Sequence, residues 1–140
     1  MLLTRLVYTS TISSAFTSDD LEKILEISRK NNPKKGITGM LFFNQKYFLQ
    51  CLEGSRQEVN ATYHKLAKDA RHTNIIILDY KEVDFREFSA WSMGYLPESS
   101  LTAPIILKYS GLNAFNPYEM SGESAHKMML ELHGNANQST

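Results

Sequence analysis

The sequence contains almost no cysteine and no excess of charge of either sign. Cys51 is the only cysteine, so no disulfide can form within the chain, and we expect a protein of the reducing cytoplasm. Fifteen basic side chains balance fifteen acidic ones, whereas proteins that bind nucleic acid or anionic membranes depend on excess positive charge. We therefore expect neither a direct nucleic-acid partner nor a membrane partner.

Long apolar segments and several familiar functional motifs are also missing. The apolar start, residues 1–7, contains Arg5 and lacks the pattern of a signal peptide, and no apolar run reaches the length of a membrane span. The chain contains neither Gly-x-Gly-x-x-Gly nor a P-loop, its four histidines lack metal-ligand spacing, and no Ser-His-Asp or Cys-His set is legible. The sequence predicts no metal site and no enzyme.

The residues that are present suit one globular domain, because 140 residues with 42% hydrophobic content can bury a core. Alternating apolar side chains predict strands, and apolar side chains at helical spacing predict helices. Ser18 is predicted to cap the first helix, which should end near Pro33, because proline disfavours helix in the preceding residue. The predicted strands are residues 3–10, 37–43, 47–53, 73–83 and 90–96, and the predicted helices are residues 18–30, 55–72, 101–109 and 123–133.

The order of these elements is β-α-β-β-α-β-β followed by two helices. Its first six elements match the split βαβ, ferredoxin-like plan, which predicts an α+β fold. The two amphipathic helices should cover one face of the sheet, and the C-terminal helices are available to cover the other. We expect a main domain over residues 1–97, a helical extension over residues 98–134 and a disordered tail over residues 135–140.

One strand of the predicted hairpin carries a polar side chain among apolar ones. Phe48, Gln50 and Leu52 share a face, because side chains alternate along a strand. A buried carboxamide needs hydrogen-bonding partners, and Tyr8 of the first strand can point to the same side. On the pattern alone, the pair is either a structural contact or part of a site.

An apolar slot between the two amphipathic helices would lie over this pair. Asn31 and Asn32 stand beside it and either cap the first helix or bind a ligand. Arg71 and His72 end the second helix, where they either complement its dipole or hold a phosphate. The apolar lining of the slot would come from Ile24, Leu25, Leu66 and Phe48.

Taken together, the motifs resemble BLUF domains, blue-light sensors that hold a flavin without a covalent bond. The resemblance covers about the first hundred residues, and the tail, with Leu107-Lys108-Tyr109-Ser110-Gly111 and two helices, is similar to that of short members without an enzymatic domain. The motifs that carry it are Arg5-Leu6-Val7-Tyr8, Asn31-Asn32-Pro33, Gly36-Ile37-Thr38-Gly39, Phe48-Leu49-Gln50-Cys51-Leu52-Glu53-Gly54, Asp69-Ala70-Arg71-His72 and Trp91-Ser92-Met93.

The resemblance implies that Tyr8 and Gln50 form the photoactive pair. It also implies that Trp91 and Met93, which the pattern alone would place in the core, are switch residues that lie close to Gln50 in one state or another. The cofactor would be FAD or FMN, with Asn32 at the polar edge of the ring, Asn31 nearby, and Arg71 and His72 toward the phosphate end. The predicted cofactor-binding residues are Tyr8, Ile24, Asn31, Asn32, Phe48, Gln50, Leu66, Arg71 and His72.

The output that the resemblance implies is association rather than catalysis. Short members of the family point to homo-oligomers and to a separate partner that is a response-regulator-like or transcriptional protein. Two other classes remain open on the residues alone: a non-catalytic RNA- or protein-binding ferredoxin-like module, and a small hydrolase on the same fold. The aromatic RNA-binding pattern and a phosphate or oxyanion cradle are not legible in the sequence, and a BLUF protein would be yellow when purified.

Overall fold

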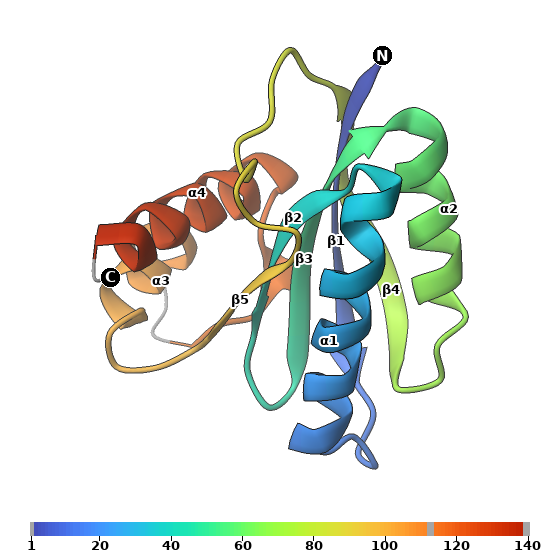
Figure 1. The fold of residues 1–140 in the computed structure, drawn as a ribbon. Coiled ribbons are helices and arrows are strands. Elements are labelled where there is room, and N and C mark those ends of the chain that lie inside the picture. Colours follow the sequence, from blue (N-terminus) through green and yellow to red (C-terminus); the bar gives the residue numbers. More distant parts are fainter. Residues whose placement is uncertain (1, 112–113, 139–140) are drawn as a thin grey trace.

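The computed structural model describes residues 2–111 and 114–138 and has three layers (Figure 1). A five-stranded sheet lies between two pairs of helices, with α1 and α2 on one face and α3 and α4 on the other (Figure 1). The elements are β1 (Leu3–Ile12), α1 (Ser18–Lys35), β2 (Thr38–Phe43), β3 (Tyr47–Ser55), α2 (Arg56–Ala67), β4 (His72–Glu82), β5 (Gly94–Pro97), α3 (Ala103–Ser110), the 3₁₀ helix η1 (Pro117–Glu119) and α4 (Gly122–Gln138).

The sheet confirms the predicted ferredoxin-like α+β fold. Its strand order is β4-β1-β3-β2-β5. The four strands of the ferredoxin-like unit pair antiparallel, and β5 joins β2 in parallel, so the sheet is mixed. In the central pair, Tyr8 of β1 lies directly opposite Gln50 of β3. The two polar residues that the sequence singles out are thus neighbours in the middle of the sheet.

Each face of the sheet has its own apolar core. Leu6 and Leu52 pack with Leu25 of α1 and Val59 of α2 on one side. Phe42, Leu49 and Cys51 pack on the other side against an apolar stripe of α4, formed by Met128, Met129 and Leu132. Because alternate residues of a strand face opposite ways, a nearly continuous apolar sequence in β3 can serve both cores. The predicted cover of both sheet faces is confirmed.

The boundaries of α1 differ from the prediction at both ends. Thr17, rather than Ser18, caps the helix: its hydroxyl accepts the N–H of Asp20, whose carboxylate accepts the N–H of Thr17. The helix also continues through Pro33 and ends at Gly36, which adopts the left-handed conformation with φ 67°. Proline near the last turn removes only one hydrogen bond, and an adjacent glycine supplies the stop signal, so the proline does not decide the end.

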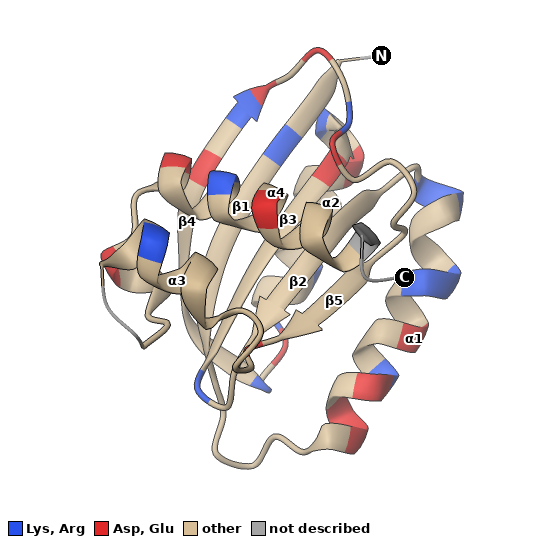
Figure 2. Ribbon diagram, turned by 90° about the vertical axis from the view of Figure 1, so that its left-hand side faces the viewer, with Lys and Arg blue, Asp and Glu red and all other residues tan. Residues whose placement is uncertain are grey.

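Charges at the two ends of α1 match the helix dipole. Acidic residues, Asp19 and Asp20, lie in its first turn, and basic residues, Lys34 and Lys35, lie in its last, as the red and blue segments of Figure 2 show. This arrangement stabilises the longer helix. Within the described ranges, none of the helices combines the length and the apolar character needed to cross a bilayer.

The prediction of a strand over residues 90–96 was wrong at its start. Only Gly94–Pro97 is strand, and the chain before it, residues 83–93, is a loop. Pairing with β2 begins at Gly94, opposite Met40, so the residues before it are not held in extended alternation. Trp91 and Met93 consequently do not share a face: Met93 packs with the α1–α2 core and Trp91 with the α4 core.

The largest remaining differences from the predicted helix ends are in α2 and α4. The second helix, α2, ends at Ala67, so Arg71 lies in the connection to β4 and His72 begins that strand, and neither ends a helix as predicted. In the other direction, α4 continues through Gly134 to Gln138 and so enters the predicted tail, of which residues 139–140 lie outside the described part. A glycine inside a helix costs only about 1 kcal/mol, which packing of the apolar stripe of α4 can offset.

Candidate functional site

The centre of the site is a hydrogen bond between two buried side chains. Tyr8 Oη donates to Gln50 Oε1, and the two residues are only 2% and 5% exposed. The predicted contact between the side chains of Tyr8 and Gln50 is therefore confirmed. Burial, with smaller contributions from nearby Tyr63 and Asp69, raises the pKa of Tyr8 well above its ordinary value. The phenol is therefore protonated in this structure and is the donor in the bond to Gln50.

The opposite end of the Gln50 carboxamide is also engaged. Its Nε2 donates to Met93 Sδ at 3.2 Å, and Met93 is 2% exposed. Trp91 lies elsewhere, half-buried, with its ring 4.3 Å from that of His133 on α4. In this structure the neighbour of Gln50 is therefore Met93 and not Trp91. A chain of contacts runs Tyr8–Gln50–Met93, from β1 through β3 to the loop before β5.

A cleft between α1 and α2 leads toward this chain. Its outer part has a volume of about 330 Å³, and a smaller inner cavity of about 20 Å³ borders Tyr8 and Gln50. Ile24, Leu66, Asp69 and Arg71 border both parts, so the inner cavity adjoins the outer part. All nine predicted cofactor-binding residues line one or both: Asn31 and Asn32 the outer part, Tyr8, Phe48, Gln50 and His72 the inner part, and Ile24, Leu66 and Arg71 both. Their contact with a flavin stays a prediction.

The asparagine pair lies within α1 and does not cap it. Asn32 is 5% exposed, and its Nδ2 donates to the carbonyl oxygen of Ser92 at 2.7 Å. Asn31 is half-buried at the wall of the cleft. Because Gly36 provides the C-cap, the capping explanation of the pair was wrong. Asn32 instead connects the cleft to the loop that carries Met93.

Arg71 and His72 have different surroundings although they are adjacent. Arg71 binds Asp69 through Nε and Nη2, at 2.6 to 3.1 Å, and this bond raises the pKa of Arg71 and lowers that of Asp69. His72 is buried, with Nδ1 2.8 Å from Ser10 Oγ and Nε2 donating to the Leu66 carbonyl at 2.6 Å. Both ring nitrogens of His72 are thus engaged within the protein, at the inner end of the cleft.

Three lysines that line the outer part of the cleft were not anticipated from the sequence. Lys35 comes from the last turn of α1, and Lys65 and Lys68 come from the end of α2. The three-residue spacing of the last two places them on one helix side, which is the signal that could have identified them. With Arg71 they outnumber the one carboxylate of the lining, Asp69, so the outer part of the cleft is basic, although the whole chain has no net charge.

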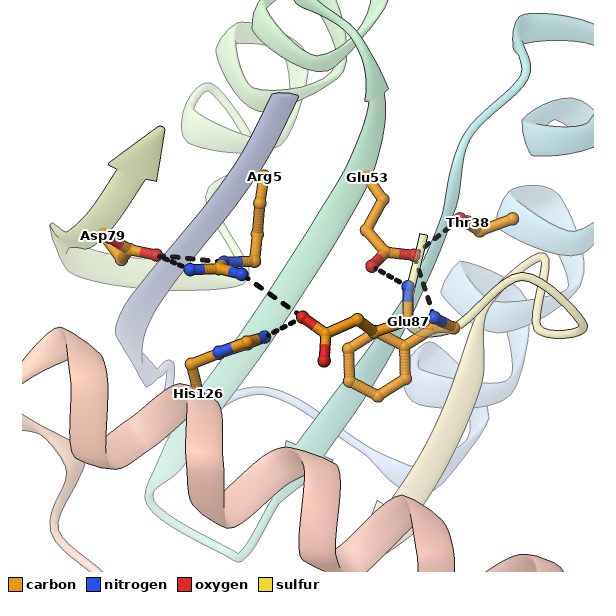
Figure 3. Close-up of polar contacts among 7 residues, drawn as sticks. Arg5, Thr38, Glu53, Asp79, Glu87 and His126 are labelled. Atoms are coloured by element: carbon orange, nitrogen blue, oxygen red, sulfur yellow. Dashed lines mark hydrogen bonds and ion pairs between the residues drawn. The ribbon is translucent and has the colours of Figure 1, made fainter. Parts of the chain in front are cut away.

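A second polar cluster lies on the other face of the sheet, under α4 (Figure 3). Arg5 of β1 pairs with Asp79 at 3.0 Å and with Glu87 at 3.3 Å, and His126 Nε2 of α4 lies 3.2 Å from the same Glu87 carboxylate. Burial, followed by the Arg5 guanidinium, lowers the pKa of His126, while Glu87, Asp79 and Glu53 oppose this effect. Among the described residues, no group of three or more His, Cys, Asp or Glu could hold a metal ion.

The fold and the site together define the class of protein. A ferredoxin-like sheet carries a ligand-sized cleft between its two helices, and the cleft ends at a buried donor–acceptor pair. The class is a small-molecule-binding α+β domain. The family model for BLUF, sensors of blue-light using FAD, matches residues 3–94, and the chain belongs to this family. This family consists of flavin-based blue-light sensors.

Known relatives agree with this assignment. The blue light- and temperature-regulated antirepressor BluF of Escherichia coli strain K12 is 35% identical over 77 residues, which are 55% of this chain and 19% of that protein. The curated relatives are longer proteins, of which the matched region makes up 8% to 19%. The photo-activated state of BlsA superposes with a TM-score of 0.86 at 32% identity over 94% of each chain. Klebsiella pneumoniae BlrP1 with FMN and cyclic diGMP gives 0.65 at 29% identity, over 69% of this chain and 26% of that one.

Proposed function

We propose that this chain senses blue light through hydrogen-bond switching at the Tyr8–Gln50 pair and relays the change to a protein partner without catalysing a reaction itself. The observation that carries the proposal is the pair at the inner end of the cleft, where the donor and the acceptor are buried and bonded to each other. A buried bond of this kind has few alternative partners, so a change in one group must change the other.

The cleft has the size and character of a small-molecule site, which supports flavin binding. Its volume of about 330 Å³ is within the range of small-molecule sites, its walls include Ile24 and Leu66, and its inner end is polar. We infer that these two side chains pack on the ring, that Asn32 and Gln50 bond its polar edge, and that Lys65 and the neighbouring cations lie toward the phosphate. The phosphate end suits either FAD or FMN, because a basic cleft mouth attracts both.

The residues around the pair set what can happen after light is absorbed. A bound flavin supplies the absorption of blue light and an oxidising excited state. Tyr8 is protonated, so it could give an electron to that oxidant and the proton on Oη to Gln50 Oε1. Return of both would leave Tyr8 unchanged, while rotation or tautomerisation of the Gln50 carboxamide would exchange its donor and acceptor ends. Rotation would break the bond from Gln50 to Met93 Sδ, because Oε1 would then face a thioether that has no proton to donate.

Loss of that bond is a route to an output. Met93 is followed by β5, and Trp91 before it packs against His133 of α4. We infer that the loop, β5 and the C-terminal helices form the element with two arrangements, and that α3 and α4 present the change to a partner. The relative named an antirepressor supports a regulatory protein as that partner. Homo-oligomers, absence of catalysis and a cytoplasmic location belong to the same proposal.

The first experiment tests binding and switching. We expect the purified protein to be yellow and to show a reversible red shift of its flavin absorption under blue light. Gln50→Ala should retain flavin and lose the shift. Asn32→Ala should weaken flavin retention, whereas the control Asn60→Ala, on the part of α2 outside the cleft lining, should not. A protein that stays colourless after refolding with FAD and with FMN would refute the proposal.

The second experiment tests the output. The size of the protein is measured in the dark and under blue light by chromatography with light scattering, alone and with partners captured by the purified photoreceptor. We expect association that differs between the two conditions. A strict monomer that binds each captured partner equally in light and dark would refute the relay while leaving flavin binding intact.

A further inference from the structure

Glu53 is a buried carboxylate on β3, the strand that also carries Gln50. Glu53 is 1% exposed and is one of the largest fully buried side chains among the described residues. It lies three positions after Gln50, so the two side chains face opposite sides of β3. A buried carboxylate is costly unless it is fully hydrogen-bonded, which makes its partners informative.

The partners of Glu53 fix the loop over residues 83–93. Its Oε2 accepts the backbone N–H of Glu87 at 2.7 Å, and its Oε1 accepts the backbone N–H of Phe88 at 3.0 Å and the Thr38 hydroxyl at 2.9 Å. Figure 3 shows the carboxylate pointing from β3 toward this loop. Arg86, in the same loop, donates to Thr38 Oγ1 at 2.8 Å and to the carbonyl of Gly36 at 2.7 Å. The loop is thereby held where it crosses the end of the sheet.

The residues that Glu53 holds, Glu87 and Phe88, are close in sequence to Met93. Phe88 is completely buried and lies five residues before it. Between them, the Trp91 N–H donates to the Phe88 carbonyl at 2.9 Å, and the Trp91 carbonyl accepts the N–H of Gly39 at 2.9 Å. The short segment between Phe88 and Gly94 therefore has little freedom, and its position follows from that of Phe88.

We propose that Glu53 is a positioning residue for the photoactive site: by holding the backbone of residues 87–88, it sets Met93 Sδ against Gln50 Nε2. The strand β3 then contacts the loop over residues 83–93 twice, through Gln50 on the cleft side and Glu53 on the α4 side. The inference rests on the proposed function, because the Gln50–Met93 contact matters to light sensing only if Gln50 is the switching group.

The carboxylate of Glu53 matches its surroundings, which offer only hydrogen-bond donors. Two oxygens accept three donors, and no proton is needed on either. A glutamine has nearly the same shape but turns one oxygen into an NH₂ group, which would face a backbone N–H or the Thr38 hydroxyl. At least one of the three bonds is then replaced by a donor–donor contact in a dry place. Glu53→Gln is therefore a test of position with little change in volume.

The test measures the photocycle of Glu53→Gln in two backgrounds. The dark recovery rate is compared for the wild type, Glu53→Gln, Met93→Leu and the double variant, with Glu82→Gln as a control. Glu82 is an exposed carboxylate of β4 that pairs with Arg56 on the surface. We expect Glu53→Gln to change the recovery rate roughly fivefold or more, as loss of one buried hydrogen bond would. In the Met93→Leu background the same substitution should change it by less than twofold, and Glu82→Gln should behave as wild type.

A second readout does not depend on the flavin. The methyl carbon of Met93, labelled with ¹³C, should give a shifted NMR signal in Glu53→Gln relative to wild type, because the methyl leaves its packed position. An unshifted signal with wild-type recovery would overturn the inference, as would an equal effect of Glu53→Gln with and without Met93. A wild-type protein that binds no flavin would overturn the proposed function, and the methyl signal would still test the positioning.

If Glu53→Gln fails to fold, Arg86→Gln replaces it in both experiments. Arg86 is half-buried and holds the same loop without contributing a buried charge to the core. We expect Arg86→Gln to shift the Met93 methyl and to lose its effect on recovery in the Met93→Leu background. Wild-type values for Arg86→Gln in both readouts would overturn the inference.

Discussion

Removal of one hydroxyl, in Tyr8→Phe, is the sharpest perturbation that the site offers. The ring is retained and keeps its packing against Tyr63, whose centroid is 5.6 Å away. The substitution removes only the bond to Gln50 Oε1 and the proton that the phenol would release. We expect Tyr8→Phe to bind flavin and to show no reversible light-induced red shift.

The expected cost in stability follows from the burial of the pair. Gln50 is 5% exposed, so its Oε1 would have neither Tyr8 nor bulk water as a partner. An unsatisfied buried acceptor costs about 1–3 kcal/mol, and the phenylalanine recovers part of this because it has no hydroxyl to desolvate. For a chain of this size, we expect the melting temperature to fall on the order of 5 °C. The variant should thus remain folded in the photocycle assay.

The matched control is Tyr63→Phe, which deletes the same hydroxyl one ring away. Tyr63 is half-buried and belongs to α2, and its ring touches that of Tyr8 at its edge. Both variants are measured by light-minus-dark absorption spectra and by thermal unfolding in the dark. We expect Tyr63→Phe to keep the red shift. A normal photocycle in Tyr8→Phe would refute the role of the phenol, and loss of the shift in both variants would show that packing, not the proton, was removed.

Two further predictions concern the α4 side of the molecule. In the unfolded chain His126 has its ordinary pKa of 6.5, whereas its pKa in the folded protein is lower, so acidification below pH 6.5 should destabilise the fold through this group. We expect the melting temperature to fall less between pH 7.5 and 5.5 in His126→Gln than in wild type. Equal losses would contradict the assignment. A methyl group at Gly94 would lie 1.8 Å from the ring of Trp91. Gly94→Ala should therefore displace the indole, change its fluorescence and alter the dark recovery rate, with flavin retained. Unchanged fluorescence would contradict the packing of Trp91 against Gly94.

Local physical chemistry determined much of the fold and the candidates for the site. Alternation along β1 and β3 and the helical stripe of α2 depend on near neighbours in the chain, so their pattern was sufficient to predict the ferredoxin-like order. The same alternation put Gln50 on an inward face and made a partner necessary. Errors arose where local signals competed: Pro33 argued for an end to α1, but Gly36 and the matching charges of the last turn extend the helix.

The connection before β5 is the clearest case where the sequence was insufficient. Residues 90–96 alternate well enough to suggest one strand, which would have placed Trp91 and Met93 together. Their separation depends on distant contacts: Gly39 bonds the Trp91 carbonyl, Asn32 bonds the Ser92 carbonyl, and the loop is held upstream by a carboxylate of β3. No nearby residue encodes these bonds, because their partners are more than thirty positions away in the chain.

The sequence by itself determined the order of the elements, the two apolar faces and the need for a partner at Gln50, because each follows from the spacing of apolar and polar side chains along the chain. Only the tertiary structure decided that Tyr8 is that partner by register, that Met93 rather than Trp91 completes the contact, and that Glu53 holds the loop between them. These are pairings across strands and between a strand and a loop, and their geometry exists only when the whole sheet and its covering helices are assembled.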